Sequence, residues 1–144
     1  MAPFAKHLTR EERMFEHIDR RELAAIAAGG AAGALLRVWI GRAVGGPGTS
    51  WPWATFSINV SGSLLLGYLL ATIGTAHGYA RPLLMTGFCG TFTTFSTMQV
   101  EILTMLERHS YGLAAGYVGA SVALGYAAVW AAGAAARRRQ RVQA

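Results

Sequence analysis

Charged residues are scarce in this chain. They make up 14% of its 144 residues, whereas 53% of the residues are hydrophobic. A soluble domain of this size normally carries more charge. Most of the charges lie towards the two ends of the sequence, and long, nearly uncharged runs separate them. The shortage of charge favours a protein embedded in lipid over an ordinary soluble domain.

Cysteine is almost absent, and histidine is absent from the apolar runs. The single Cys89 excludes an internal disulfide framework, and no metal-ligating residues cluster around it in the sequence. All four histidines fall in the tails or in expected loops, so no serine within an apolar run has an obvious general base. Paired carboxylates and a phosphate-binding loop are also lacking. We therefore expect that the protein is not an enzyme.

The basic residues gather at the ends of the apolar runs. The net charge is +6, but the arginines do not form the basic face, interleaved with aromatic residues, that nucleic-acid-binding proteins show. Positively charged flanks of membrane helices explain their positions better, so we expect a lipid environment and no nucleic-acid partner. Residues 1–22 lack the apolar core of a cleavable signal peptide. The first apolar run is therefore expected to remain in the mature protein.

Four apolar runs are long enough to cross a bilayer, since about 20 apolar residues span its hydrocarbon core. They lie near residues 23–44, 53–76, 83–106 and 111–136. Short connections separate them, so consecutive helices should be antiparallel neighbours. The sequence thus predicts an all-α, multi-pass membrane protein. Its expected parts are a polar N-terminal tail at 1–22, a four-helix transmembrane domain at 23–136, and a basic C-terminal tail at 137–144.

The third run contains an unusually polar segment between Gly87 and Thr97, with two glycines and five hydroxyl side chains. Hydrocarbon tolerates non-helical backbone only where protein buries it or where it lines an aqueous cavity. A break near residues 87–91 would free carbonyl oxygens suited to an alkali cation and point the following half-helix inward. An unbroken helix, whose hydroxyls bond back to the preceding turn, is the alternative.

Several other side chains in the runs are candidates for an ion pathway. Phe92 and Phe95 are three residues apart, so both rings are expected on nearly the same helix face, where ring edges can meet a dehydrated anion. Packing against lipid or core is the ordinary alternative. Asn59 either ties helices together or lines a pore. Tyr117 and Ser121 are four apart and therefore share a helix face.

Two charged residues and three glycine pairs also fall within or at the edges of these runs. Intramembrane charges mark functional sites by default, although long side chains near a helix end can reach the interface. Arg37 is expected to reach a vestibule and attract anions, whereas Glu101 is either functional or interfacial.

Glycines spaced four apart predict tight helix packing. The pairs are Gly29 and Gly33, Gly41 and Gly45, and Gly112 and Gly116.

Three segments together resemble the Fluc (CrcB) family of fluoride channels. They are residues 29–34 leading to Arg37, Asn59 with Gly62, and residues 87–97 leading to Glu101. The resemblance covers residues 23–136. It implies a passive, fluoride-selective channel in the cell membrane that exports cytoplasmic fluoride. It also implies an antiparallel, dual-topology dimer of four-helix subunits in which the third helix is broken in mid-membrane.

The resemblance further assigns roles to particular residues. It places the fluoride pathway at Arg37, Asn59, Phe92, Thr94, Phe95, Tyr117 and Ser121. The backbone carbonyls of Gly87 and Gly90 are implied to hold one structural sodium ion (Na+) that is not transported. The chain departs from the family's pattern beyond Ser121, where Gly125 and Val129 replace further hydroxyls, and at Thr91, where many relatives have glycine. The later part of the polar track therefore stays undefined.

Two alternative functions and the identity of the dimer partner remain open. A small four-helix multidrug-type exporter needs a carboxylate in its first span, where this chain has Arg37. A non-transporting membrane assembly subunit should tolerate loss of Phe92 and Phe95. Ten of the 13 Lys and Arg residues lie on the side of the two tails, which predicts tails-in insertion. An antiparallel dimer needs half the copies inverted, so pairing with itself and pairing with a paralogous subunit are both possible.

Overall fold

The computed structural model describes residues 19–44, 51–73 and 78–143, and the regular structure within them is helical. The helices are α2 (Arg20–Val44), α3 (Trp53–Ile73), η1 (Pro82–Cys89), α4 (Gly90–Phe92), α5 (Phe95–Glu107) and α6 (Tyr111–Gln143). Among the described helices, α2, α3 and α6 are each long and apolar enough to cross a membrane. The third predicted run is divided among η1, α4 and α5.

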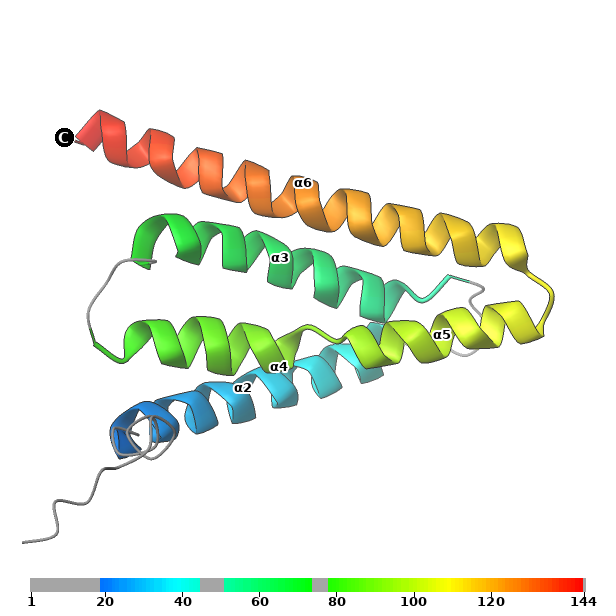
Figure 1. Ribbon diagram of the computed structural model, residues 1–144, viewed down its shortest axis with the longest axis horizontal. Helices are drawn as coiled ribbons and strands as arrows, with labels where there is room; N and C mark the ends of the chain where they lie inside the picture. The colour runs from blue at the N-terminus through cyan, green and yellow to red at the C-terminus, as the bar shows by residue number, and fades with distance from the viewer. Residues whose placement is uncertain (1–18, 45–50, 74–77, 144) are drawn as a thin grey trace, which may run out of the picture.

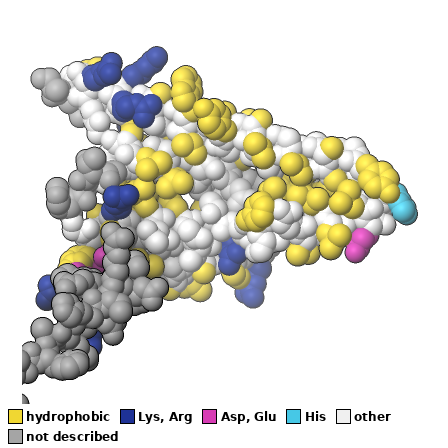
Figure 2. Space-filling view, viewed as in Figure 1, with side chains coloured by type: hydrophobic (Ala, Val, Ile, Leu, Met, Phe, Trp, Pro, Cys, Tyr) yellow, Lys and Arg dark blue, Asp and Glu magenta, His cyan; other side chains and the backbone are white. Residues whose placement is uncertain are grey.

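The helices lie side by side, and successive runs point in opposite directions (Figure 1). The beginning of α2, the end of α3 and the end of α6 therefore lie at the same end of the molecule. Large apolar side chains such as Leu35, Trp39 and Trp130 are about two-thirds exposed or more. Figure 2 shows hydrophobic side chains over the middle of the visible face and Lys and Arg mainly at its margins. This distribution suits a surface covered by lipid.

Helix α2 packs closely against η1 because glycines face the contact from both sides. A Cβ atom added to Gly29 would collide with the backbone of Leu83, and one added to Gly33 would collide with the carbonyl of Phe88. Gly87 in turn lies against the backbone of Ile26. The predicted tight packing is confirmed for the pair Gly29 and Gly33. The other pairs show no such contact at Gly41, Gly112 and Gly116, and Gly45 lies outside the described residues.

Helices α3 and α6 run in the same direction and pack along their lengths (Figure 1). Gly67 is so close to the backbone of Val129 that it has no room for a Cβ atom, while the Cβ position of Gly125 lies 3.6 Å from Ser63 Oγ. In both pairs the α6 residue number is 62 higher than that of its α3 neighbour. This constant offset defines the register between the two helices.

The chain breaks the helical path of the third run at Thr93 and Thr94. Both residues are extended, with ψ angles of 154° and 115°, and α5 begins at the next residue. The prediction of a break near residues 87–91 was wrong in position. Gly87 lies within the π-helix η1, and Gly90 is helical, with φ −63° and ψ −27°. The physical reason is that Gly87 provides room for α2 and thereby supports helix packing.

The predicted tails are partly helical. Most of the N-terminal tail lies outside the described residues, but α2 begins at Arg20, and the Asp19 carboxylate accepts a hydrogen bond of 2.8 Å from the backbone N–H of Arg21. At the other end, α6 continues to Gln143. The amide of Gln140 donates to the carbonyl of Ala71 at 3.3 Å. The segment predicted as a basic tail is therefore largely the last part of α6.

Candidate functional site

Asn59 binds the backbone at the break. Its Nδ2 donates to the carbonyl of Thr94 at 3.1 Å, and the N–H of Thr94 donates to its Oδ1 at 2.9 Å. The side-chain amide thus replaces helical partners that the extended Thr94 has lost. The interpretation that Asn59 ties helices together is confirmed. The alternative, that Asn59 lines an ion pathway, stays a prediction.

Thr94 also forms the N-cap of α5. Its hydroxyl accepts a hydrogen bond from the N–H of Thr97 at 3.2 Å and lies 2.8 Å from the hydroxyl of Thr97. Caps of this kind satisfy one of the free N–H groups in the first turn of a helix. The partial positive charge at a helix N-terminus attracts anions. The break consequently places the favourable end of α5 beside Asn59.

A cavity of about 330 Å³ adjoins this break. Its lining includes the polar or aromatic side chains of Asn59, Ser63, Thr93, Thr94 and Phe95 and the backbone of Gly90. They come from α3, α4, α5 and the extended linker, so the broken third run and α3 build the cavity together. Phe95 is 69% exposed within this single chain. Its ring is therefore available to a ligand or to a neighbouring molecule.

Phe92 and Phe95 do not form a pair on one helix face, because the break lies between them. Phe92 ends α4, is 4% exposed, and stacks on Phe88 with ring centroids 5.5 Å apart. It also packs against Gly62 of α3. The predicted shared face was wrong because Thr93 and Thr94 interrupt the helical periodicity. Of the two rings, only Phe95 lines the cavity.

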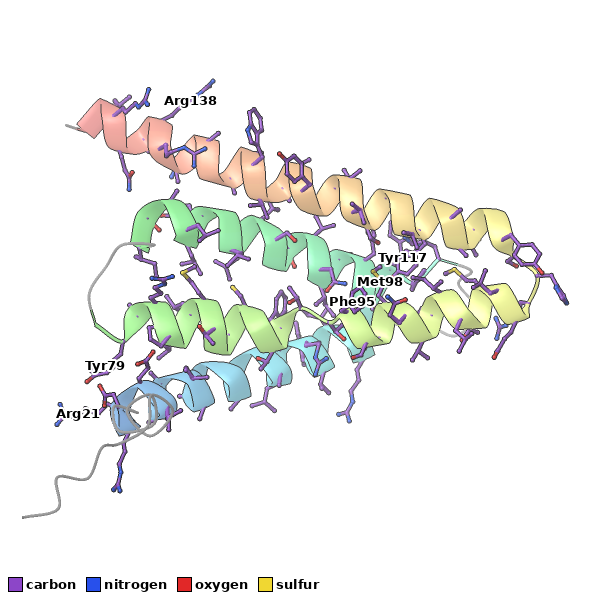
Figure 3. The ribbon with its side chains drawn as sticks, viewed as in Figure 1. Arg21, Tyr79, Phe95, Met98, Tyr117 and Arg138 are labelled. Atoms are coloured by element: carbon purple, nitrogen blue, oxygen red, sulfur yellow. The ribbon has the colours of Figure 1, made fainter. Side chains whose placement is uncertain are left out.

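A second polar group lies further along α5. Glu101 accepts a hydrogen bond of 2.6 Å from the hydroxyl of Thr55 and one of 2.7 Å from the hydroxyl of Tyr117. These contacts join α3, α5 and α6, and Tyr117 is completely buried. Figure 3 shows Tyr117 and Met98 between α5 and α6, with Phe95 at the beginning of α5. Glu101 is thus a connected carboxylate rather than a free interfacial charge.

Ser121 lies one turn after Tyr117 on the same helix. Its hydroxyl oxygen is buried and has no hydrogen-bond partner among the described residues. A buried hydroxyl without a partner is uncommon, because the lost hydration is normally replaced. The structure therefore leaves the polar group of Ser121 available to a ligand. Arg37 is half-buried on α2 and does not line the cavity.

The two carbonyls predicted to hold sodium differ in their environment. In a continuous helix the N–H of Thr94 would bond to the carbonyl of Gly90, but here it bonds to Asn59. The break therefore frees the oxygen of Gly90, which suits an alkali cation. The carbonyl of Gly87 instead accepts from the hydroxyl of Thr91 at 3.0 Å and from the N–H of Gly90. Gly90 fits the predicted ligand role, whereas Gly87 already has protein partners.

Sequence reasoning missed several residues of the site. Thr91 of α4 connects that helix to α2, since its hydroxyl donates to the carbonyl of Gly30 at 2.8 Å. Thr55 binds Glu101, and Ser63 and Thr93 line the cavity. The signal for Ser63 was its spacing of four residues from Asn59, which puts both on one face. The partners of Thr55 and Thr91 lie far away in sequence, so no local pattern revealed them.

Comparison with known proteins identifies the family. Residues 24–133 match the family described as CrcB-like protein, Camphor Resistance (CrcB). The chain belongs to the CrcB family. A CrcB relative from Mycolicibacterium paratuberculosis, named fluoride-specific ion channel FluC 1, is 55% identical over 120 residues, which cover 81% of this chain and 89% of that protein.

Two other CrcB relatives also match this chain over most of their length. One from Mycobacterium bovis, named fluoride-specific ion channel FluC 1, is 48% identical over 83% of this chain and 93% of its own length. One from Novosphingobium aromaticivorans, named fluoride-specific ion channel FluC, is 43% identical over 69% of this chain and 83% of its own length. Together with the three membrane-capable helices, CrcB membership makes this chain a multi-pass membrane protein.

Proposed function

We propose that this CrcB protein forms a passive, fluoride-selective channel that lets fluoride leave the cytoplasm. The observation that carries the proposal is the broken third run, where Asn59 holds an extended linker beside a cavity and the N-terminus of α5. A plain membrane anchor has no need of such a break. The relatives named as fluoride-specific ion channels supply the identity of the ion.

The chemistry of the site suits a small, strongly hydrated anion. A channel has to replace the water shell of such an ion with groups that point positive charge at it. The cavity offers the amide of Asn59, the hydroxyl of Ser63 and the positive end of the α5 dipole. The exposed ring of Phe95 adds a positive aromatic edge. These groups stabilise an anion without carrying the full charge that would trap it.

Transport through such a pathway is driven by the membrane potential. Moving one charge across 100 mV corresponds to about 2.3 kcal/mol, and a potential negative inside drives anions outward. No carboxylate lies in α2 beyond Glu22 in its first turn, so this helix lacks the mid-span titratable group that a proton-coupled exporter would use. Fluoride enters cells as a neutral weak acid and dissociates inside. Passive export of the anion then relieves its accumulation.

The channel is proposed to be an antiparallel dimer, formed with itself or with a paralogous subunit, around one structural sodium ion that is not transported. The free carbonyl of Gly90 supports a cation site at the break. The carbonyl of Gly87 already has the Thr91 hydroxyl 3.0 Å away, so Gly90 is the better-supported ligand of the two. Carbonyl oxygens bind sodium without adding net negative charge, which preserves an anion pathway nearby.

Reconstitution in liposomes tests the function. Purified protein should release fluoride when a membrane potential is imposed, and chloride release should stay at the background rate of protein-free liposomes. Ion-selective electrodes measure both ions. Equal fluoride and chloride release would contradict selectivity, and fluoride release that requires a proton gradient would favour an exporter. No fluoride release from a folded, inserted protein would contradict the channel itself.

Removal of sodium tests the cation site separately. Exchanging sodium for a large organic cation should weaken the dimer and lower fluoride release, and adding sodium back should restore both. Size-exclusion chromatography and the electrode assay measure the two effects. Full activity and an intact dimer after exhaustive exchange would contradict a structural sodium ion while leaving the fluoride pathway in place.

A further inference from the structure

We propose that Ser63 supplies the third polar position of the ion pathway and replaces the hydroxyl that α6 lacks at Gly125. The inference rests on the proposed channel function and adds a residue to it. Ser63 belongs to α3, whereas Tyr117 and Ser121 belong to α6. The polar track thus passes from one helix to the other.

The register of α3 and α6 orders these residues into levels. At the first level Thr55 and Tyr117 are joined through Glu101. At the third level the Cβ position of Gly125 lies 3.6 Å from Ser63 Oγ. Both pairs have the same offset of 62 residues, and successive levels are four residues apart on each helix. Residues four apart share a helix face, so the levels form one continuous row.

The second level lies between these two and holds Asn59 and Ser121, which have the same offset. Asn59 contributes its amide at the break, and Ser121 has a buried hydroxyl without a partner among the described residues. Each of the first two levels therefore carries a polar side chain on α6. The third level has none on α6, because that position is Gly125.

Ser63 provides the missing hydroxyl at the third level. It lines the same cavity as Asn59, and its hydroxyl makes no hydrogen bond within the part of the chain that the structure describes. A hydroxyl in this position can donate to an ion that has lost water. Gly125 contributes by being small, since α6 can approach while the oxygen of Ser63 keeps its place.

The fourth level ends the row. There Gly67 meets the backbone of Val129, and a Cβ atom on Gly67 would collide with it. This contact joins the two backbones and leaves no room for a side chain on Gly67, and neither residue carries a hydroxyl, so the row of hydroxyls ends at Ser63. The register explains why a chain with Gly125 and Val129 can still have a polar row of three levels.

A hydroxyl-transfer experiment tests the inference in full-length protein reconstituted in liposomes. Ser63→Ala should slow fluoride release roughly tenfold, as expected for the loss of one hydrogen bond to an ion. Adding Gly125→Ser to Ser63→Ala should restore most of the rate, because the new Cβ lies in ordinary contact distance. Adding Gly125→Ala instead should not restore it. Ser61→Ala, an exposed serine bonded to Ile58, is the matched control and should keep the wild-type rate.

The outcomes separate this inference from the proposed function. Slow release in Ser63→Ala with rescue by serine, but not by alanine, at position 125 supports it. Wild-type release in Ser63→Ala overturns it and leaves the channel function intact. Equal rescue by alanine and serine also overturns it, because packing rather than a hydroxyl would then be responsible. A wild-type protein that releases no fluoride overturns both proposals. Size-exclusion profiles confirm that each variant is folded.

Discussion

Asn59 and Thr94 show how single side chains make the break possible. In a bilayer a peptide group without a partner costs several kcal/mol. Asn59 supplies both a donor and an acceptor to Thr94. The backbone N–H and C=O of this extended residue therefore both keep a hydrogen-bond partner. Its second amide hydrogen has no partner among the described residues and can serve a ligand. One side chain therefore supports the backbone and faces the cavity.

The two phenylalanines should respond differently to substitution. Phe95→Ile is expected to leave the fold intact and to lower fluoride release at least about tenfold, because an exposed ring edge at the cavity is lost. Phe92→Ile should mainly lower thermal stability, since Phe92 is buried and stacked on Phe88. Liposome release and thermal unfolding in detergent measure the two effects.

A contrary pattern would be informative. Unchanged release in Phe95→Ile would assign its ring to packing against lipid or a partner. Loss of release in Phe92→Ile without loss of stability would restore the role that the resemblance gives to this residue. Phe88→Ile serves as a control, because it removes the same stacked contact from the other side.

At the scale of elements, the N-cap of α5 fixes where the half-helix begins. Thr94→Val keeps the shape of the side chain but removes the hydroxyl that accepts from Thr97. We expect a loss of about 0.5–2 kcal/mol in the free energy of unfolding, the usual cost of losing such a cap. Thr94→Ser should stay near wild type. Chemical or thermal unfolding of both variants measures the difference, and equal stability would show that the cap contributes little.

The glycine contact between α2 and η1 gives a second element-scale prediction. Gly29→Ala should separate the two helices and destabilise the protein by several kcal/mol, because the new methyl group would collide with the Leu83 backbone. Gly41→Ala on the same helix meets nothing within 4 Å and should be neutral or slightly stabilising. The two variants are compared by their expression level and by their thermal unfolding. A tolerated Gly29→Ala would show that η1 can shift.

The presence of the long membrane helices could be predicted from the sequence, whereas the candidate site could be predicted only in part. Long apolar runs determine membrane helices, so the runs beginning near Leu23, Trp53 and Tyr111 were confirmed. The position of the break depends on the side chain of Asn59, a contact between residues 35 apart in sequence. The glycines of the third run therefore suggested a helix break near Gly87, whereas tertiary contacts place the break at Thr93 and Thr94. The pairing of Glu101 with Thr55 and Tyr117 is likewise non-local.

At the scale of the whole molecule, the distribution of charge makes orientation testable. The described basic residues of the C-terminal end and Arg81 lie at one end of the molecule, and Arg42 and Arg108 belong to the other. The positive-inside rule then predicts mostly tails-in insertion. A C-terminal tag on this chain, expressed alone, should be protected from a membrane-impermeant label in most copies. Equal inside and outside populations would instead indicate a self-pairing, dual-topology protein.

The length of α6 has a consequence for the bilayer itself. With 33 residues and a rise of about 1.5 Å per residue, it is roughly 50 Å long, more than the about 40–45 Å of a bilayer with its headgroups. A helix that starts at one interface therefore carries its final arginines into and past the opposite headgroup layer. Bilayers of different thickness can be accommodated by how much of this basic end emerges. Helices α3 and α6 then need not tilt in the bilayer or slide against each other when membrane thickness changes.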